Sequence, residues 1–295
     1  MPNTTANGIQ IEYETFGDRH SPPLLLIMGL SAQMIGWEEE FCKRLVEKGL
    51  FVIRFDNRDV GLSTKFKEAG IPDIVAAMQG QEFQAAYSLD DMADDAVGLL
   101  DALGIEKAHI CGVSMGAMIT QVIGYRHPSR VLSLIPIMGS TGNPALLRAK
   151  PEAFKMLITP APEEREAYIE HYVIKWKVFW GSLHFDEDIV RKRAAVSYDR
   201  AFYPQGIARQ HAAIISNGNR KSRLASITAP TLVIHGSEDP LLPVEHGKDT
   251  AEAIPDAEML IIDGMGHCLP KVVWPKIVDA IANHTNKQQP LEVDI

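Results

Sequence analysis

The stretch HICGVSMGAMIT, from His109 to Thr120, decides the fold. Ser114 follows an apolar run that is typical of a buried strand and precedes residues that favour a helix. Glycines flank it in the pattern G-x-S-x-G. A sharp strand-to-helix turn holds such a serine in a strained conformation, and side chains at Gly112 or Gly116 would collide with the neighbouring strand and helix. The stretch therefore predicts a nucleophile exposed at the carboxyl edge of a sheet.

Short apolar runs elsewhere predict the rest of that sheet. The pair Asn7-Gly8, flanked by alternating residues, predicts a hairpin that leads into a strand. Continuous apolar runs, typical of strands buried on both faces, occupy residues 24–29, 51–56, 108–113, 131–137, 231–236 and 258–263. Helical patterns occupy residues 38–49, 88–104 and 115–127. This alternation predicts the α/β class, with a mostly parallel central sheet flanked by helices.

The alternation breaks after about residue 139, where the chain becomes helical and rich in aromatic residues. We therefore expect an α/β core of residues 1–139 and 229–295, with a helical cap of residues 140–228 inserted over the active edge. Most cap aromatics are expected to form the cap's own core, although an apolar or aromatic substrate would also suit them. The candidates for the substrate pocket are Gly29, Trp176, Phe179 and Trp180.

A serine hydroxyl is a weak nucleophile that needs a base, and the base needs a group to orient it. On this kind of sheet the acid follows the serine and the histidine follows the acid. Asp239 lies in TLVIHGSEDPLLP and His267 in EMLIIDGMGHCLP, each just after a predicted strand. We predict a triad of Ser114, His267 and Asp239. Glu238 is the competing carboxylate, and Asp263 is less favoured because it lies only four residues from the histidine.

An oxyanion hole requires two N–H groups near the serine. The backbone N–H of Met115, at the start of the helix, is one candidate. The loop MGLSAQMIGW supplies the other, and Leu30 is its expected donor because Gly29 permits close approach. Ser31 could add a hydrogen bond, with less support from the pattern. Cys268, beside the predicted histidine, is interpreted as structural.

Composition excludes several classes of function. The 295 residues carry a net charge of -9 with no basic stripe, which argues against binding nucleic acid or an anionic membrane. No apolar run approaches a membrane span, and the first residues do not read as a signal peptide, so we expect a cytoplasmic protein. Three scattered cysteines and the absence of HExxH, CxxC and P-loop patterns predict no metal and no cofactor. The expected partner is a small-molecule ester, and the chain is expected to be a monomer or a homodimer.

With these motifs in order, the chain resembles the α/β-hydrolase superfamily over nearly its full length. The segments LIMGLSAQMIGW, FDNRDVGLST, HICGVSMGAMITQ and GMGHCLP are similar to an aclacinomycin methylesterase-like bacterial subgroup. The resemblance implies a serine esterase with a helical cap and no cofactor. The chain departs from the family pattern at Asp59, where glycine is usual, and at Met28, where histidine is usual. It also has Ala117 where many relatives have glycine.

The predicted reaction is hydrolysis of small to medium apolar or aromatic esters, methyl esters among them, through an acyl-enzyme. The same triad could instead cleave C–C bonds or act as a perhydrolase, an activity also called cofactor-free haloperoxidase. A ligand-binding protein on the same fold, without turnover, is the alternative from another class. Epoxide hydrolases and dehalogenases of this superfamily carry aspartate at the elbow, so Ser114 argues against them.

Overall fold

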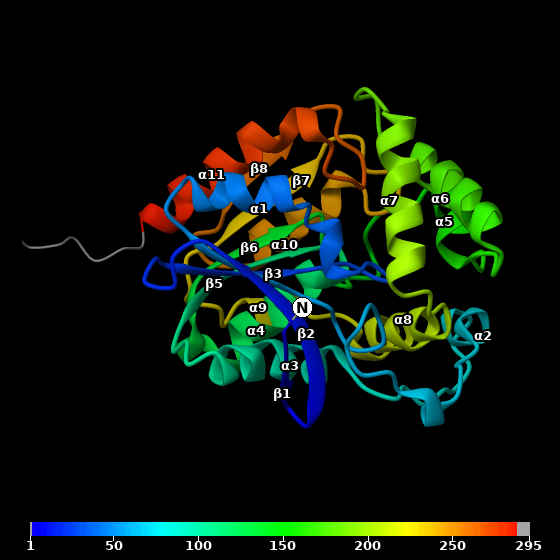
Figure 1. The fold of residues 1–295 in the computed structure, drawn as a ribbon, viewed down its shortest axis with the longest axis horizontal. Coiled ribbons are helices and arrows are strands. Elements are labelled where there is room, and N and C mark those ends of the chain that lie inside the picture. The colour runs from blue at the N-terminus through cyan, green and yellow to red at the C-terminus, as the bar shows by residue number, and fades with distance from the viewer. Residues whose placement is uncertain (1, 288–295) are drawn as a thin grey trace, which may run out of the picture.

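Within residues 2–287, the part of the chain that this computed structural model describes, eight strands form one sheet in the order β1-β2-β4-β3-β5-β6-β7-β8 (Figure 1). The β1–β2 and β2–β4 pairs are antiparallel, and all other neighbouring pairs are parallel. The strands are β1 (Asn3–Ala6), β2 (Ile9–Phe16), β3 (Pro23–Ile27), β4 (Phe51–Phe55), β5 (Ala108–Val113), β6 (Val131–Ile137), β7 (Leu232–Gly236) and β8 (Glu258–Ile262).

Helices cover both faces of the sheet and one end of it. Figure 1 shows α1 and α11 on one face, α3 and α4 on the other, and α5, α6 and α7 grouped beyond the sheet. The helices are α1 (Glu39–Val46), α2 (Ile74–Met78), α3 (Leu89–Ala102), α4 (Met115–Arg126), α5 (Pro151–Ile158), α6 (Arg165–Phe179), α7 (Glu187–Arg200), α8 (Gln205–Asn217), α9 (Lys221–Leu224), α10 (Val244–Ala253) and α11 (Trp274–Asn286). The described part of the chain contains no helix long and apolar enough to cross a bilayer.

The six apolar runs form β3 to β8, and the predicted hairpin joins β1 to β2. Asn7 and Gly8 both have positive φ, at 48° and 77°, as a two-residue hairpin turn requires. One expectation is wrong, because β8 is not buried on both faces. Glu258 and Ile261 are exposed, the latter at 40%. The reason is that β8 is the last strand of the sheet and has a neighbour on one side only.

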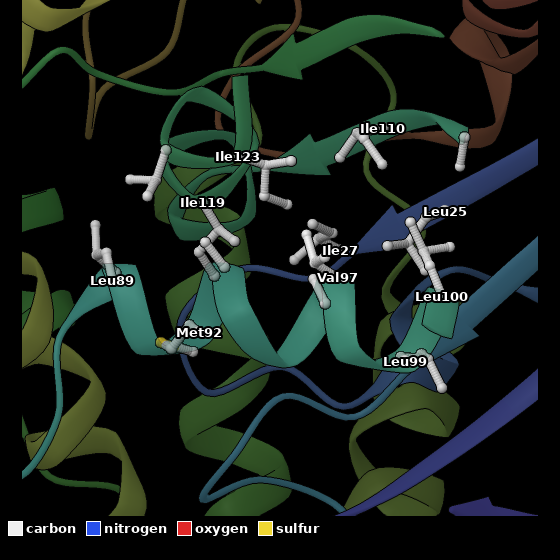
Figure 2. Close-up of a cluster of buried hydrophobic side chains, with 14 of the residues drawn as sticks. Leu25, Ile27, Leu89, Met92, Val97, Leu99, Leu100, Ile110, Ile119 and Ile123 are labelled. Carbon is white, nitrogen blue, oxygen red and sulfur yellow. The ribbon is translucent and has the colours of Figure 1, made fainter. Parts of the chain in front are cut away.

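Strand β3 divides its side chains between two hydrophobic cores, one on each face of the sheet. Leu25 and Ile27 belong to the core under α3 and α4, which Figure 2 shows, whereas Leu24 and Leu26 belong to the core under α1 and α11. This alternation follows from the two-residue period of a strand. Because all four side chains are fully buried, the strand reads as one continuous apolar run.

The predicted α3 helix begins and ends at residues suited to those positions. The Ser88 hydroxyl accepts from the Asp91 N–H while the Asp91 carboxylate accepts from the Ser88 N–H, which forms a capping box. Gly104, just beyond the helix, has a φ of 68°.

Helices α5 to α9 lie between β6 and β7, so the chain leaves the sheet for a helical insertion and returns to it. Together these five helices form the cap. The predicted fold class, a mostly parallel sheet with inserted helices, is confirmed.

Candidate active site

Ser114 stands at the junction of β5 and α4 with φ 55° and ψ -117°, a strained conformation for a residue with a side chain. The glycines around it have a steric reason. A Cβ on Gly116 would lie 2.2 Å from the Ile27 carbonyl oxygen at the end of β3, and one on Gly112 would lie 2.1 Å from the Gly116 carbonyl oxygen. The neighbouring strand and helix therefore exclude any side chain at either position, as the sequence predicts.

Three side chains that are distant in sequence meet at this elbow. The Ser114 hydroxyl donates to Nε2 of His267 at 2.9 Å, and Nδ1–H of His267 donates to Oδ2 of Asp239 at 2.7 Å. The histidine and the aspartate are 6% and 4% exposed. The arrangement can pass the serine proton to a histidine whose positive form is stabilised by a buried carboxylate.

Asp239 is held by more than its histidine. Its Oδ1 accepts from the N–H groups of Leu241 and Leu242 at 2.9 and 2.8 Å, and Nε2 of His235 lies 3.5 Å from its Oδ2. Burial alone would raise the pKa of this carboxyl, but the charge and the hydrogen bond of His267, together with the nearby His235, outweigh it. The pKa therefore lies well below the usual range, and the group stays ionised.

The competing carboxylates have other partners. Glu238 accepts a hydrogen bond from the Ser182 hydroxyl at 2.8 Å, and Asp263 accepts one from the Ser237 hydroxyl at 3.2 Å. Of the three carboxylates that the sequence analysis weighed, only Asp239 is hydrogen-bonded to the histidine ring.

The predicted oxyanion loop runs beside the serine. A Cβ on Gly29 would lie 3.1 Å from Cβ of Ser114, so Leu30 follows immediately after the point of closest approach. Met115 is the first residue of α4, where N–H groups lack helical partners. Among the described residues, neither the Leu30 nor the Met115 N–H donates to a protein acceptor. Both remain available to an oxygen that becomes negatively charged next to the serine.

Two residues that follow β4 fix this loop from one side. The Asn57 side-chain amide donates to the Met28 carbonyl oxygen at 3.0 Å, and Asp56 accepts from the Met34 N–H at 2.7 Å. The sequence analysis did not assign them this role. Their position in FDNRDVGLS, directly after a strand that ends at the active edge, was the available signal.

A glutamine of the cap fixes the loop from the other side. Gln210 on α8 accepts from the Ser31 N–H at 2.9 Å and donates to the Arg58 carbonyl oxygen at 2.8 Å. Sequence reasoning missed this residue, and no local pattern marks it.

A family model described as the alpha/beta hydrolase fold matches residues 22–271. The chain belongs to the α/β-hydrolase fold family. It is similar to rhodomycin D methylesterase DauP of Streptomyces sp. (strain C5), with 31% identity over 95% of this chain and 96% of that protein. Rhodomycin D methylesterase DnrP of Streptomyces peucetius matches with the same identity and coverage. The predicted resemblance to methylesterases of this family is confirmed.

Among solved structures, the meta-cleavage product hydrolase of Pseudomonas fluorescens IP01 superposes on this hydrolase with a TM-score of 0.77. The alignment covers 98% of each chain at 19% sequence identity, so it shows the shared fold.

In this α/β-hydrolase the predicted pocket aromatics lie against the histidine loop. The Phe179 ring meets the His267 ring edge-on, with 6.0 Å between the ring centroids. The Trp176 ring centroid lies 6.1 Å from that of Phe179 and 6.5 Å from that of Trp180. The Phe179 carbonyl accepts the His267 N–H at 2.6 Å, and the Trp180 carbonyl accepts the Gly266 N–H at 2.9 Å. These residues support the loop that carries the histidine, and their contact with substrate stays a prediction.

Cys268, next to the histidine, is buried, and its thiol donates to the Trp180 carbonyl oxygen at 3.3 Å. Burial raises the pKa of this thiol well above its ordinary value. The thiol is therefore protonated at neutral pH and is not a competing nucleophile.

Proposed function

We propose that this α/β-hydrolase is a serine carboxylesterase that acts on small to medium apolar or aromatic esters, with methyl esters as the first class to test. The observation that carries the proposal is the continuous hydrogen-bonded line from Asp239 through His267 to Ser114, at an elbow that strains the serine. The two similar Streptomyces proteins are named as methylesterases, which supports esters as the substrate class.

The first half of the reaction forms an acyl-enzyme. Nε2 of His267 takes the hydroxyl proton as Oγ of Ser114 attacks the ester carbonyl carbon. The N–H groups of Leu30 and Met115 stabilise the oxyanion that develops, while the ionised Asp239 stabilises the imidazolium. The tetrahedral intermediate then expels the alcohol, which leaves with the proton held by the histidine.

The second half regenerates the enzyme. His267 takes a proton from a water molecule, whose oxygen attacks the acyl carbon. The same two N–H groups stabilise the second tetrahedral intermediate. Its collapse breaks the bond to Oγ of Ser114, which recovers its proton from the histidine, and releases the carboxylic acid.

A substrate panel tests the proposal. Methyl esters, short-chain p-nitrophenyl esters and aryl esters are assayed with the wild type and with Ser114→Ala. We expect serine-dependent hydrolysis of at least one apolar or aromatic ester. The proposal fails if a folded wild type leaves the entire panel unhydrolysed.

The same panel distinguishes the other reactions that this triad supports. A meta-cleavage dienoate tests for C–C hydrolysis, and a carboxylic acid with hydrogen peroxide tests for perhydrolysis. Higher kcat/KM on either than on every ester would replace the esterase assignment. A wild type that binds esters without turnover would favour the ligand-binding alternative.

A further inference from the structure

We propose that Gln210, on cap helix α8, is a positioning residue for the oxyanion hole. It fixes the peptide that follows Leu30 and thereby holds the Leu30 N–H in place. The inference rests on the proposed function, because it concerns the amide to which that mechanism assigns the oxyanion.

The Gln210 side chain is fully buried and satisfies two backbone groups of different polarity. Its oxygen accepts from the Ser31 N–H, which can only donate, and its nitrogen donates to the Arg58 carbonyl, which can only accept. Only one orientation of the side-chain amide meets both demands. The residue therefore joins the oxyanion loop to the segment after β4 through a single rigid group.

The loop at this point is a tight turn in a conformation that serine disfavours. The Ala32 N–H donates to the Gly29 carbonyl at 3.2 Å, and Ser31, the third residue of the turn, has a φ of 66°. A positive φ at this position is the mark of a type II turn, where glycine is preferred. The alternative type I turn needs no left-handed residue and reverses the central peptide between Leu30 and Ser31. The hydrogen bond to Gln210 opposes that reversal, because it fixes the direction of the Ser31 N–H.

The turn also determines the direction of the Leu30 N–H. This N–H and the Gly29 carbonyl belong to one planar peptide and point in opposite directions. Because the carbonyl accepts from Ala32 inside the turn, the Leu30 N–H points out of it. Without the hydrogen bond from the Ser31 N–H to Gln210, the turn loses its anchor to the cap. The Leu30 N–H, which belongs to the same turn, would then shift with it away from the developing charge.

Helix α8 presents the glutamine from a fixed position. The preceding residue, Arg209, binds Asp59 through Nε at 2.7 Å and Nη2 at 3.0 Å, with both side chains buried. The cap is thus fastened to the core directly beside the contact with the oxyanion loop.

The test compares three variants in the full chain. Gln210→Met removes both hydrogen bonds and keeps a side chain of similar size. Gln210→Glu keeps an oxygen that accepts from the Ser31 N–H, but it places a second carboxylate oxygen against the Arg58 carbonyl oxygen, where the amide nitrogen donated. Gln121→Met is the matched control: Gln121 is a buried glutamine on α4 that bonds Arg220 and Thr250, away from the loop. The readouts are kcat and KM on the best ester, the rate at which a fluorophosphonate modifies Ser114, and Tm.

We expect Gln210→Met to lower kcat and the phosphonylation rate about tenfold to a hundredfold, with KM within about twofold, because a donor is misplaced rather than removed. Gln210→Glu should retain more activity than Gln210→Met yet have the lower Tm, because it buries a charge. Opposite orders of activity and stability would not arise from a merely structural role. Gln121→Met should lower Tm and keep the wild-type kcat.

The proposal is overturned if Gln210→Met reacts with the fluorophosphonate at the wild-type rate, or if both Gln210 variants lose activity only in proportion to their loss of Tm. A wild type that is phosphonylated but hydrolyses no ester contradicts the proposed function alone, since the phosphonylation rates still decide the role of Gln210. A wild type that is not phosphonylated overturns both.

Discussion

Ser114 and Asp59 both lie at the carboxyl edge of the sheet, and both adopt a backbone conformation that normally favours glycine. Their φ angles are 55° and 67°. The serine follows β5 and directs its hydroxyl to His267. The aspartate lies beyond β4 and directs its carboxylate to Arg209 of the cap.

The difference between them lies in what offsets the strain. At the elbow, glycines at positions 112 and 116 leave room for the strained conformation of Ser114, which places a reactive group beside His267. Asp59 instead accepts hydrogen bonds from Arg209, from the Tyr87 hydroxyl and from the Phe66 N–H, the last two at 2.8 Å. A positive φ thus serves catalysis at Ser114 and attachment of the cap at Asp59. Substitutions should therefore separate activity from stability.

Ser114→Ala carries the largest expected effect on activity. The kcat/KM for ester hydrolysis should fall by about 10⁴- to 10⁶-fold, because the nucleophile is removed. Tm should change by only a few degrees, since the hydroxyl contributes a single hydrogen bond to the fold. Steady-state kinetics measures the kcat/KM, and thermal unfolding measures the Tm. Near-full activity of Ser114→Ala would show that the strained serine does not serve catalysis.

Asp239→Asn should reduce kcat by about 10³- to 10⁴-fold. The amide cannot stabilise the imidazolium, and it favours the wrong tautomer of His267. Its oxygen can still accept from Leu241 and Leu242, so the variant should fold. A loss below tenfold in single-turnover acylation would remove Asp239 from the mechanism.

Arg209→Met tests whether the strained Asp59 serves to attach the cap. It leaves the Asp59 carboxylate buried without its cation, which should lower the free energy of unfolding by about 3 to 5 kcal/mol. The double variant Asp59→Gly/Arg209→Met removes the unpaired charge and the strained φ together, so it should recover part of that loss. Urea unfolding of both single variants and the double variant measures the coupling, and strictly additive effects would show that the pair does not act as a unit.

A fall in pH should lower the stability of the protein by a smaller amount, through one buried histidine in the sheet and one in the cap. His109 lies on β5 and His211 lies on α8, and burial lowers the pKa of each to about 4 from its ordinary value of 6.5. Between those values the unfolded chain binds protons that the folded protein does not, so stability is complete above pH 6.5 and is lost as the pH falls toward 4.

The expected loss between pH 7.5 and pH 5 is about 2 kcal/mol for each histidine. Urea unfolding at the two pH values measures it. His109→Gln should remove about 2 kcal/mol of the pH dependence, and equal wild-type stability at both values would contradict the assignment.

The elbow could be predicted from sequence because its physics is local. The glycines beside Ser114 and the apolar strand before it lie within a few residues. Asp239 and His267 could be predicted because each follows a strand, and parallel strands bring their carboxyl ends to one edge. The apolar runs likewise predict strands β3 to β8. They do not predict that β8 is exposed, because the residues of one strand do not show which strand lies at the edge of the sheet.

The contacts that hold the cap could not be predicted in this way. Gln210 meets Ser31 across 179 positions of sequence, and Arg209 meets Asp59 across 150, so their partners depend on how α8 packs. The sequence marks Asp59 as a departure from the family pattern, yet nothing near it in the sequence indicates that its partner is Arg209. The helix α11 was missed although Trp274, Ile277 and Val278 recur at helical spacing.

Intact-mass analysis after treatment with a fluorophosphonate shows whether Ser114 is an activated nucleophile. We expect one adduct per wild-type chain, mapped to Ser114, and no adduct on a folded Ser114→Ala variant. A folded wild type that stays unmodified, or a Ser114→Ala variant that is modified to the same extent, would contradict it.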